Sequence, residues 1–95
     1  MITFSQIRDE NQAAGLHWFD TDTMVCFGTE LGSIFEGPGG VFFTTRETEP
    51  ASGEKKWSIR QWDADMCGVQ TIEFFKYDTR ITADLFAEDM ANADV

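Results

Sequence analysis

The sequence predicts a single α+β domain spanning residues 1–95, in which an antiparallel three- to four-stranded meander packs with an N-terminal helical segment and a C-terminal amphipathic helix. Three observations support this prediction. A chain of 95 residues can enclose only one hydrophobic core. Apolar residues recur at helical spacing toward both ends of the chain, whereas they alternate with a period of two in its middle. Hydrophobic residues make up 42% of the chain and aromatic residues 14%, which argues against disorder despite a net charge of -10.

The first third of the chain is predicted to be helical. Residues 3–14 form the first predicted helix, because Thr3 or Ser5 can cap its amide groups and Gly15 suits a left-handed stop. Residues 20–32 form a second predicted helix, which begins at an Asp-Thr-Asp sequence and ends at a glycine. Its apolar residues at helical spacing are Met24, Phe27 and Leu31.

The meander is predicted in the middle of the chain. Residues 33–37 are expected to form a short strand, and the Gly-Pro-Gly-Gly sequence at its end forms a turn. Three alternating segments follow, over residues 41–46, 56–65 and 69–78, and their short connections favour antiparallel pairing between neighbours. The side chains expected to face the helices are Val41, Phe43, Trp57, Ile59, Ile72 and Phe74. We expect the helices to cover this one face of the sheet.

Residues 78–93 form the clearest predicted helix. Asp78 or Thr79 provides its N-cap. The side chains expected to pack on the sheet are Ile81, Leu85, Phe86 and Met90. On the opposite side of this helix, Asp84 and Glu88 lie one turn apart and begin a negatively charged surface.

No residue pattern in the chain is typical of a catalytic, metal-binding or phosphate-binding site. The two cysteines, Cys26 and Cys67, lie at no recognisable spacing from His17, which is the only histidine. The Asp-Thr-Asp and Asp-Ala-Asp sequences lack the roughly six to eight ligands that bind calcium, so we interpret them as caps and turns. We therefore expect a protein that is not an enzyme and needs no metal or cofactor. Because the chain shows no signal peptide and no long apolar run, we expect a cytosolic location.

Acidic residues dominate the charge of the chain. Seventeen acids oppose seven basic residues and give a pI of about 4.2, so the surface repels nucleic acids and anionic membranes and attracts basic partners. Solubility alone would also explain this acidity. The candidate partner-binding residues are Asp84, Glu88 and Asp89 on the last helix, with Asp20, Asp22, Glu30 and Glu36 before the sheet.

A second candidate surface is the sheet face that is expected to lie opposite the helices. It carries Phe42, Arg60, Trp62 and Phe75. Several folds use aromatic side chains beside arginines to stack single-stranded bases, but binding to phosphates requires a cationic surface that this chain lacks. Cross-strand packing and ion pairs explain the same residues without any ligand. An exposed aromatic patch would instead indicate a protein partner.

The sequence pattern HWF, then TMVCF, then GGVFFTTRE, followed by a second aromatic strand and a terminal amphipathic helix, resembles small phage and prophage proteins of unknown function over about residues 16–90. In size and charge the chain is similar to anti-CRISPR and other anti-defence inhibitors, some of which imitate DNA. This resemblance implies a non-enzymatic inhibitor that binds a host nucleic-acid-handling complex, such as a CRISPR effector, in the host cytosol. The alternative is a structural or regulatory phage module that binds a protein through the aromatic sheet face.

Overall fold

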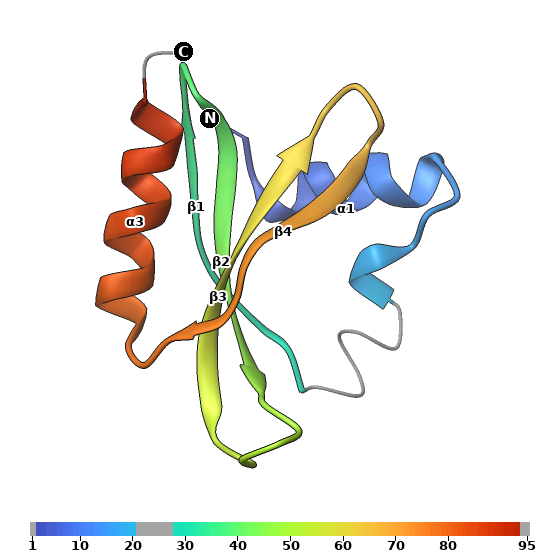
Figure 1. Ribbon diagram of the computed structural model, residues 1–95. Helices are drawn as coiled ribbons and strands as arrows, with labels where there is room; N and C mark the ends of the chain where they lie inside the picture. Colours follow the sequence, from blue (N-terminus) through green and yellow to red (C-terminus); the bar gives the residue numbers. More distant parts are fainter. Residues whose placement is uncertain (1, 21–27, 94–95) are drawn as a thin grey trace.

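A four-stranded antiparallel sheet and two main helices form the fold in the computed structural model, which describes residues 2–20 and 28–93 (Figure 1). The strands lie in the order β1-β2-β3-β4, so each strand pairs with its neighbour in the chain. The elements are α1 (Phe4–Ala13), the 3-10 helix η1 (Trp18–Asp20), β1 (Glu30–Gly37), β2 (Gly40–Thr48), β3 (Lys55–Asp63), β4 (Gly68–Tyr77) and α3 (Arg80–Asn92). The predicted α+β class, a meander with an N-terminal and a C-terminal helix, is confirmed.

Both helices begin at threonine caps. In α1 the amide of Gln6 donates to Thr3 Oγ1 at 3.3 Å, and the amide of Thr3 donates back to the Gln6 side chain at 2.8 Å. Gly15 follows this helix with a φ of 81°, in the left-handed region that glycine adopts without steric cost. In α3 the side chain of Thr79 accepts from the amide of Thr82. The predicted boundaries at Thr3, Gly15 and Thr79 are therefore confirmed.

Strand β1 replaces the end of the second predicted helix. Residues 21–27 of that prediction lie outside the described residues. They include the predicted apolar positions Met24 and Phe27. The end of the prediction is wrong, because Leu31 pairs with Thr45 in the sheet. A register shift between Leu31 and Ile34 interrupts the ladder, so the apolar residues of β1 do not show the strict alternation that identifies a strand.

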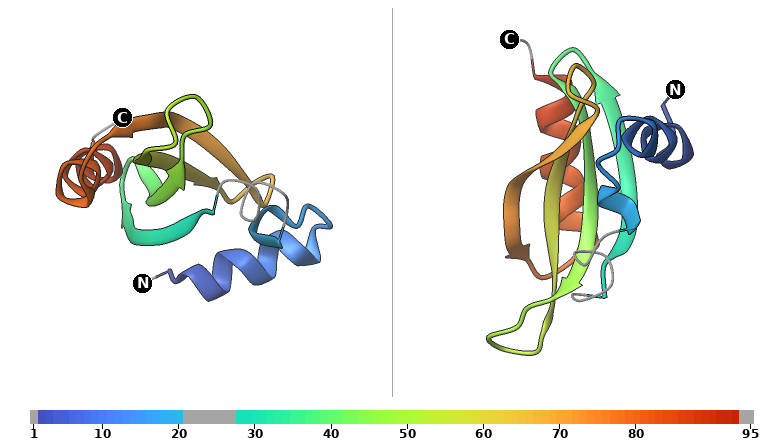
Figure 2. Two further views of the ribbon diagram at one scale, coloured as in Figure 1. Left: turned by 90° about the horizontal axis from the view of Figure 1, so that it is seen from below. Right: turned by 90° about the vertical axis from the view of Figure 1, so that its right-hand side faces the viewer.

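The sheet is covered on both faces, with α3 on one side and α1 on the other (Figure 2). Phe42 and Phe43 are consecutive in β2 and point to opposite faces, so each face needs its own apolar cover. The core on the α3 side contains Phe42, Ile59, Tyr77, Ala83, Ala87 and Ala91. The core on the α1 side contains Ile7, Phe19, Phe43 and Trp62. The prediction that the helices cover a single face is therefore wrong.

The strand residues that were predicted to face the core together actually lie on both faces of the sheet. Phe43 pairs with Arg60 and Thr44 pairs with Ile59, so Phe43 and Ile59 lie on opposite faces of the sheet. Two members of the predicted set are exposed, Ile72 and Phe74. Periodicity therefore identifies the strands, whereas their register decides which side chains share a face.

Helix α3 packs on the sheet through alanines instead of its large apolar side chains. Its buried residues are Ala83, Ala87 and Ala91. The predicted contacts are largely exposed, with exposed fractions of 75% for Ile81, 61% for Leu85 and 47% for Phe86. Met90 packs partly against the core, and the ring of Phe86 stacks on that of the core residue Tyr77 with centroids 5.3 Å apart. The prediction that the helix packs on the sheet through Leu85 is wrong, whereas Phe86 does contact the sheet, at Tyr77 of β4.

Close approach between α3 and the β1–β2 turn explains this orientation. The amide of Gly39 donates to the carbonyl oxygen of Ala91 at 2.8 Å. A Cβ atom on Gly37 would lie 2.3 Å from the Ala91 oxygen, and one on Gly39 would lie 2.2 Å from the Met90 oxygen. Because the backbones are this close, only small side chains fit between the C-terminal end of α3 and the β1–β2 turn.

Candidate functional site

Five of the seven basic side chains lie at one end of the sheet, where carboxylates neutralise them. Six of the seven basic side chains lie within 4.0 Å of a carboxylate. The pairs are Arg46–Glu30, Lys55–Glu30, Lys56–Glu54, Lys56–Asp78, Arg60–Glu47, Lys76–Glu73 and Arg80–Asp84. Apart from Arg60, the paired basic residues lie around the β2–β3 hairpin, the end of β4 and the start of α3. This end of the molecule therefore has little net charge, and we call it the neutral end.

The opposite end of the sheet carries carboxylates that have no basic partner within 4.0 Å among residues 2–20 and 28–93. We call this surface the acidic end. It consists of Asp9 and Glu10 on α1, Glu36 at the end of β1, Asp63 and Asp65 at the β3–β4 turn, and Glu88 and Asp89 on α3. Glu88 and Asp89 belong to this end because the next turn of α3 contacts Gly39 in the β1–β2 turn.

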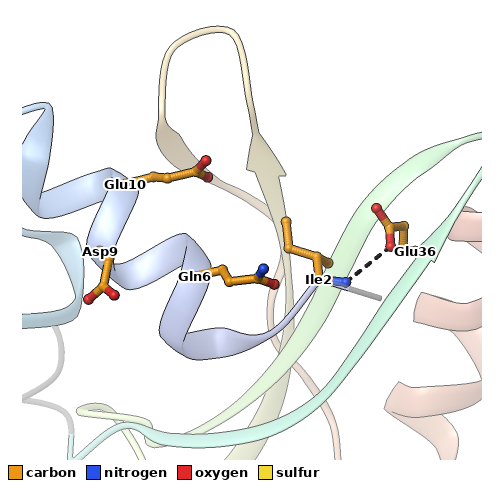
Figure 3. A pocket seen from close by; sticks show the side chains of 5 residues that line it. All are labelled: Ile2, Gln6, Asp9, Glu10 and Glu36. Carbon is orange, nitrogen blue, oxygen red and sulfur yellow. Dashed lines mark hydrogen bonds between the residues drawn. The ribbon is translucent and has the colours of Figure 1, made fainter.

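An open depression of about 540 Å³ between α1 and β1 forms one part of the acidic end (Figure 3). It is lined by Ile2, Gln6, Asp9, Glu10 and Glu36. Figure 3 shows Gln6 and Glu10 extending from α1 toward the strand that carries Glu36. The amide of Ile2 donates to Glu36 Oε1 at 3.2 Å, which joins the start of the chain to β1. The lining contains three carboxylates and no basic side chain, so it favours cationic groups.

A second depression, of about 330 Å³, lies at the β3–β4 turn. Its lining includes Asp63 and Asp65, and Asp63 Oδ1 accepts hydrogen bonds from the amides of Asp65 at 3.0 Å and Met66 at 3.2 Å. Val41 also lines it, and Val41 is the strand partner of Glu36, which lines the first depression. Because neighbouring strands are about 4.8 Å apart, the two depressions lie close together at the same end of the sheet.

Only some of the predicted acidic residues lie at the acidic end. Glu36, Glu88 and Asp89 lie at the acidic end, which they share with four acids that the prediction did not include. Glu30 lies at the neutral end and is paired with two basic side chains. Asp20 is exposed in η1 and accepts a hydrogen bond from the side chain of Gln12. Asp22 lies outside the described residues.

Asp84 holds α3 to the sheet and is not a free surface acid. Its carboxylate accepts a hydrogen bond at 2.8 Å from the hydroxyl of Ser33 and another at 2.8 Å from the hydroxyl of Thr44. Arg80 Nε lies 3.4 Å from the same carboxylate. The side chain of Asp84 is 24% exposed. Its role in the structure is therefore to connect α3 to β1 and β2.

The predicted aromatic sheet face is interior. Phe42, Arg60 and Trp62 are exposed by only 7%, 2% and 3%, and Phe75 is half-buried. Phe42 is covered by α3, whereas Trp62 packs in the core on the α1 side. The prediction that these residues form a contact surface is therefore wrong for Phe42, Arg60 and Trp62, which are buried.

A buried ion pair occupies the centre of the α1 side of the sheet. Arg60 donates to Glu47, to Thr71 and, at 3.2 Å, to Thr45. Glu47 also accepts from Thr45 at 2.6 Å and from Ser58 at 2.9 Å. The guanidinium lies between two rings, 5.4 Å from the Trp18 centroid and 4.8 Å from the Phe74 centroid. The interpretation of this face by cross-strand packing and ion pairs is therefore confirmed for Arg60, whereas the complete burial of the pair was not predicted.

Two groups at the neutral end have raised pKa values. The side-chain hydrogen bond from Lys56 to Asp78, 2.7 Å long, raises the pKa of Lys56 above its usual 10.5. Burial raises the pKa of Tyr77 above its usual 10.0, and the neighbouring charge of Glu73 acts in the same direction. Both groups therefore keep a proton in the folded protein at pH values where the unfolded chain begins to lose it.

The described residues contain no group of three or more His, Cys, Asp or Glu side chains that could hold a metal ion. Their helices are also too short or too polar to cross a membrane. The fold and its charge distribution define a small α+β domain with one acidic and one neutral end. Residues 3–88 match the model of a family of unknown function, DUF7447, and the chain belongs to this family. No curated protein and no solved structure matches the chain.

Proposed function

We propose that this protein is a non-enzymatic inhibitor that binds a basic, nucleic-acid-handling protein in the cytosol of a host cell, with a defence complex such as a CRISPR effector as the favoured target. The observation that supports this proposal is the separation of charge along the sheet. Five of the seven basic side chains lie at one end and are paired there with carboxylates, and the carboxylates of the acidic end have no basic partner within 4.0 Å in the described part of the chain.

An acidic end of this kind suits a surface that normally binds DNA. Double-stranded DNA carries one negative charge per roughly 1.7 Å of its axis, and Lys and Arg side chains of a binding groove neutralise those charges. Clustered carboxylates can engage the same side chains and thereby exclude DNA from the groove. The like charge of nucleic acid and of the acidic end opposes direct binding between them. The protein is therefore proposed to contact another protein and neither nucleic acid nor a membrane.

A pair of charge-matched variants tests this proposal. Glu36→Gln/Asp65→Asn removes two charges from the acidic end, and both amides keep an oxygen that can accept a hydrogen bond. Glu49→Gln/Glu54→Gln removes two charges from the β2–β3 hairpin and serves as the control. Each variant would be used to capture proteins from a host lysate, with mass spectrometry of the bound fraction and elution by duplex DNA.

We expect the wild type and the hairpin control to capture the same basic protein and the acidic-end variant to lose most of it. Duplex DNA should release the captured protein, and raised salt should weaken capture because exposed charges are screened beyond about 8 Å at physiological ionic strength. Equal capture by all three proteins, or a captured protein that DNA does not displace, would contradict the proposal.

A further inference from the structure

Two large apolar side chains are exposed at the acidic end, on segments that are far apart in the sequence. Leu16 follows α1 and is 51% exposed, and Met66 lies in the β3–β4 turn and is 70% exposed. A Cβ atom on Gly68 would lie 3.8 Å from Leu16 Cδ1 and 4.0 Å from the carbonyl oxygen of Met66, so the two residues are neighbours. We call them the apolar pair.

A buried asparagine holds the apolar pair in place. Asn11 of α1 is fully buried, and its Nδ2 donates to the carbonyl oxygen of Cys67 at 2.8 Å, which joins the helix to the β3–β4 turn (Figure 1). Its Oδ1 accepts from the amide of Trp18 at 2.6 Å, and its carbonyl oxygen accepts from the amide of Leu16 at 3.1 Å. These bonds fix the backbone beside both members of the pair. The surface is therefore preformed, so binding on it costs little conformational entropy.

Carboxylates border the apolar pair. Asp63 Oδ1 accepts from the amide of Met66 at 3.2 Å, and Asp65 directly precedes Met66 in the turn. Neither carboxylate has a basic side chain within 4.0 Å among residues 2–20 and 28–93. An apolar centre with a charged border is typical of protein contacts, in which buried apolar groups supply affinity and charges at the rim select the partner.

We propose that the apolar pair binds an apolar side chain that the partner carries between lysine or arginine residues. Exposed ion pairs contribute little affinity by themselves, because water and salt screen them. An apolar side chain that covers Leu16 and Met66 supplies affinity that carboxylates alone do not. The unpaired acids favour a basic partner and oppose a second copy of this acidic chain. This inference rests on the proposed function for the class of partner, and it adds the apolar contact.

Two peptides of equal charge test this proposal. One has two leucines between two pairs of lysines, and in the other peptide serines replace the leucines. Each would be titrated at low salt into isotope-labelled protein, with the amide chemical shifts followed by NMR. The leucine peptide should bind at least roughly threefold more tightly, because it covers apolar surface that the serine peptide leaves in contact with water. The amides that shift most should be those around Leu16 and Met66.

Matched variants locate the contact. Leu16→Gln/Met66→Gln removes both apolar side chains without a change in charge, and it should bind the two peptides equally. Ile81→Gln/Leu85→Gln removes two exposed apolar side chains from α3 and should keep the wild-type preference for leucine. Circular dichroism would establish that both variants are folded. Met66→Gln alone changes only the more exposed member of the pair and should already reduce the preference.

Equal affinity of the wild type for the two peptides overturns the proposal, as does a preference for leucine that persists in Leu16→Gln/Met66→Gln. Capture from a host lysate separates this inference from the proposed function. If Leu16→Gln/Met66→Gln captures the same basic protein as the wild type with equal affinity, the apolar contact is wrong and the proposed function stands. If the wild type captures no basic protein, the proposed function is wrong, and the peptide preference still decides the apolar contact.

Discussion

Removing the carboxylate of Glu47 should destabilise the protein more than any change at a surface ion pair. Glu47 is fully buried and accepts hydrogen bonds from Thr45, Ser58 and Arg60. Replacing it with alanine leaves a buried guanidinium without its counter-charge, which typically costs about 3–5 kcal/mol. A domain of this size has a free energy of unfolding of about 5–15 kcal/mol, so Glu47→Ala would lose a large part of it. We expect the melting temperature to fall by at least about 12 °C.

Urea unfolding of a double-mutant cycle measures this effect. Glu47→Gln keeps the shape of the side chain and should cost about 1.5–3 kcal/mol, the usual range for a hydrogen bond to a charged group. Combined with Arg60→Met, it should cost clearly less than the sum of the two single changes, because each single variant leaves one buried charge unpaired whereas the double variant leaves none. Glu30→Ala, which removes an exposed pair with Arg46, is the control and should cost less than about 1 kcal/mol. Additive single changes, or a Glu47→Ala protein as stable as Glu30→Ala, would refute the assignment of a buried ion pair.

Three further predictions follow from packing and from the raised pKa values. Asp84→Ala should lower the free energy of unfolding by about 1.5–3 kcal/mol in urea titrations, whereas Glu88→Ala should change it by less than about 0.5 kcal/mol; equal effects would mean that Asp84 is a free surface acid. Gly39→Ala should cost at least about 1 kcal/mol because its Cβ would lie 2.2 Å from a backbone oxygen, whereas in Gly68→Ala the nearest atom is 3.8 Å away and thermal melting should barely change. Tyr77 has a raised pKa, so its contribution to stability is complete below about pH 10 and is lost as the pH rises through its folded-state pKa. Unfolding monitored by fluorescence should show this loss of stability above pH 10, and the loss should be smaller in the Tyr77→Phe variant.

The sequence predicted the strands and the helix termini because these depend on local chemistry. Alternation along β2 and β3 and the threonine caps at Thr3 and Thr79 act within a few residues, and all of them are confirmed. The packing of α3 depends instead on a distant contact. Nothing near Leu85 in the chain shows that Gly37 and Gly39 approach the helix, so the larger apolar residues were assigned to the core and the alanines were overlooked.

The candidate site was predictable in character but not in position. Counting charges correctly indicates an excess of acids, because the composition of a surface follows from the sequence. Counting cannot show which acids are neutralised. Glu30 and Asp84 form ion pairs with Arg46 and Arg80. Asp63 and Asp65, which the sequence analysis interpreted only as turn residues, have no basic partner within 4.0 Å among the described residues. Which acidic and basic side chains form ion pairs depends on the register of the strands. In β1 a bulge between Leu31 and Ile34 shifts that register by one residue.

The hydrogen bond between Ile2 and Glu36, together with the contact between Gly39 and Ala91, has a practical consequence for experiments. Both place an end of the described chain beside the acidic end, so an affinity tag or fluorescent protein fused before Ile2 or after Ala93 would lie next to the surface proposed to bind. The β2–β3 hairpin provides an alternative. Its loop is closed by a hydrogen bond from the amide of Glu49 to the carbonyl of Glu54 at 2.8 Å, and its tip at residues 50–53 is exposed. A short peptide tag inserted there would leave the acidic end accessible.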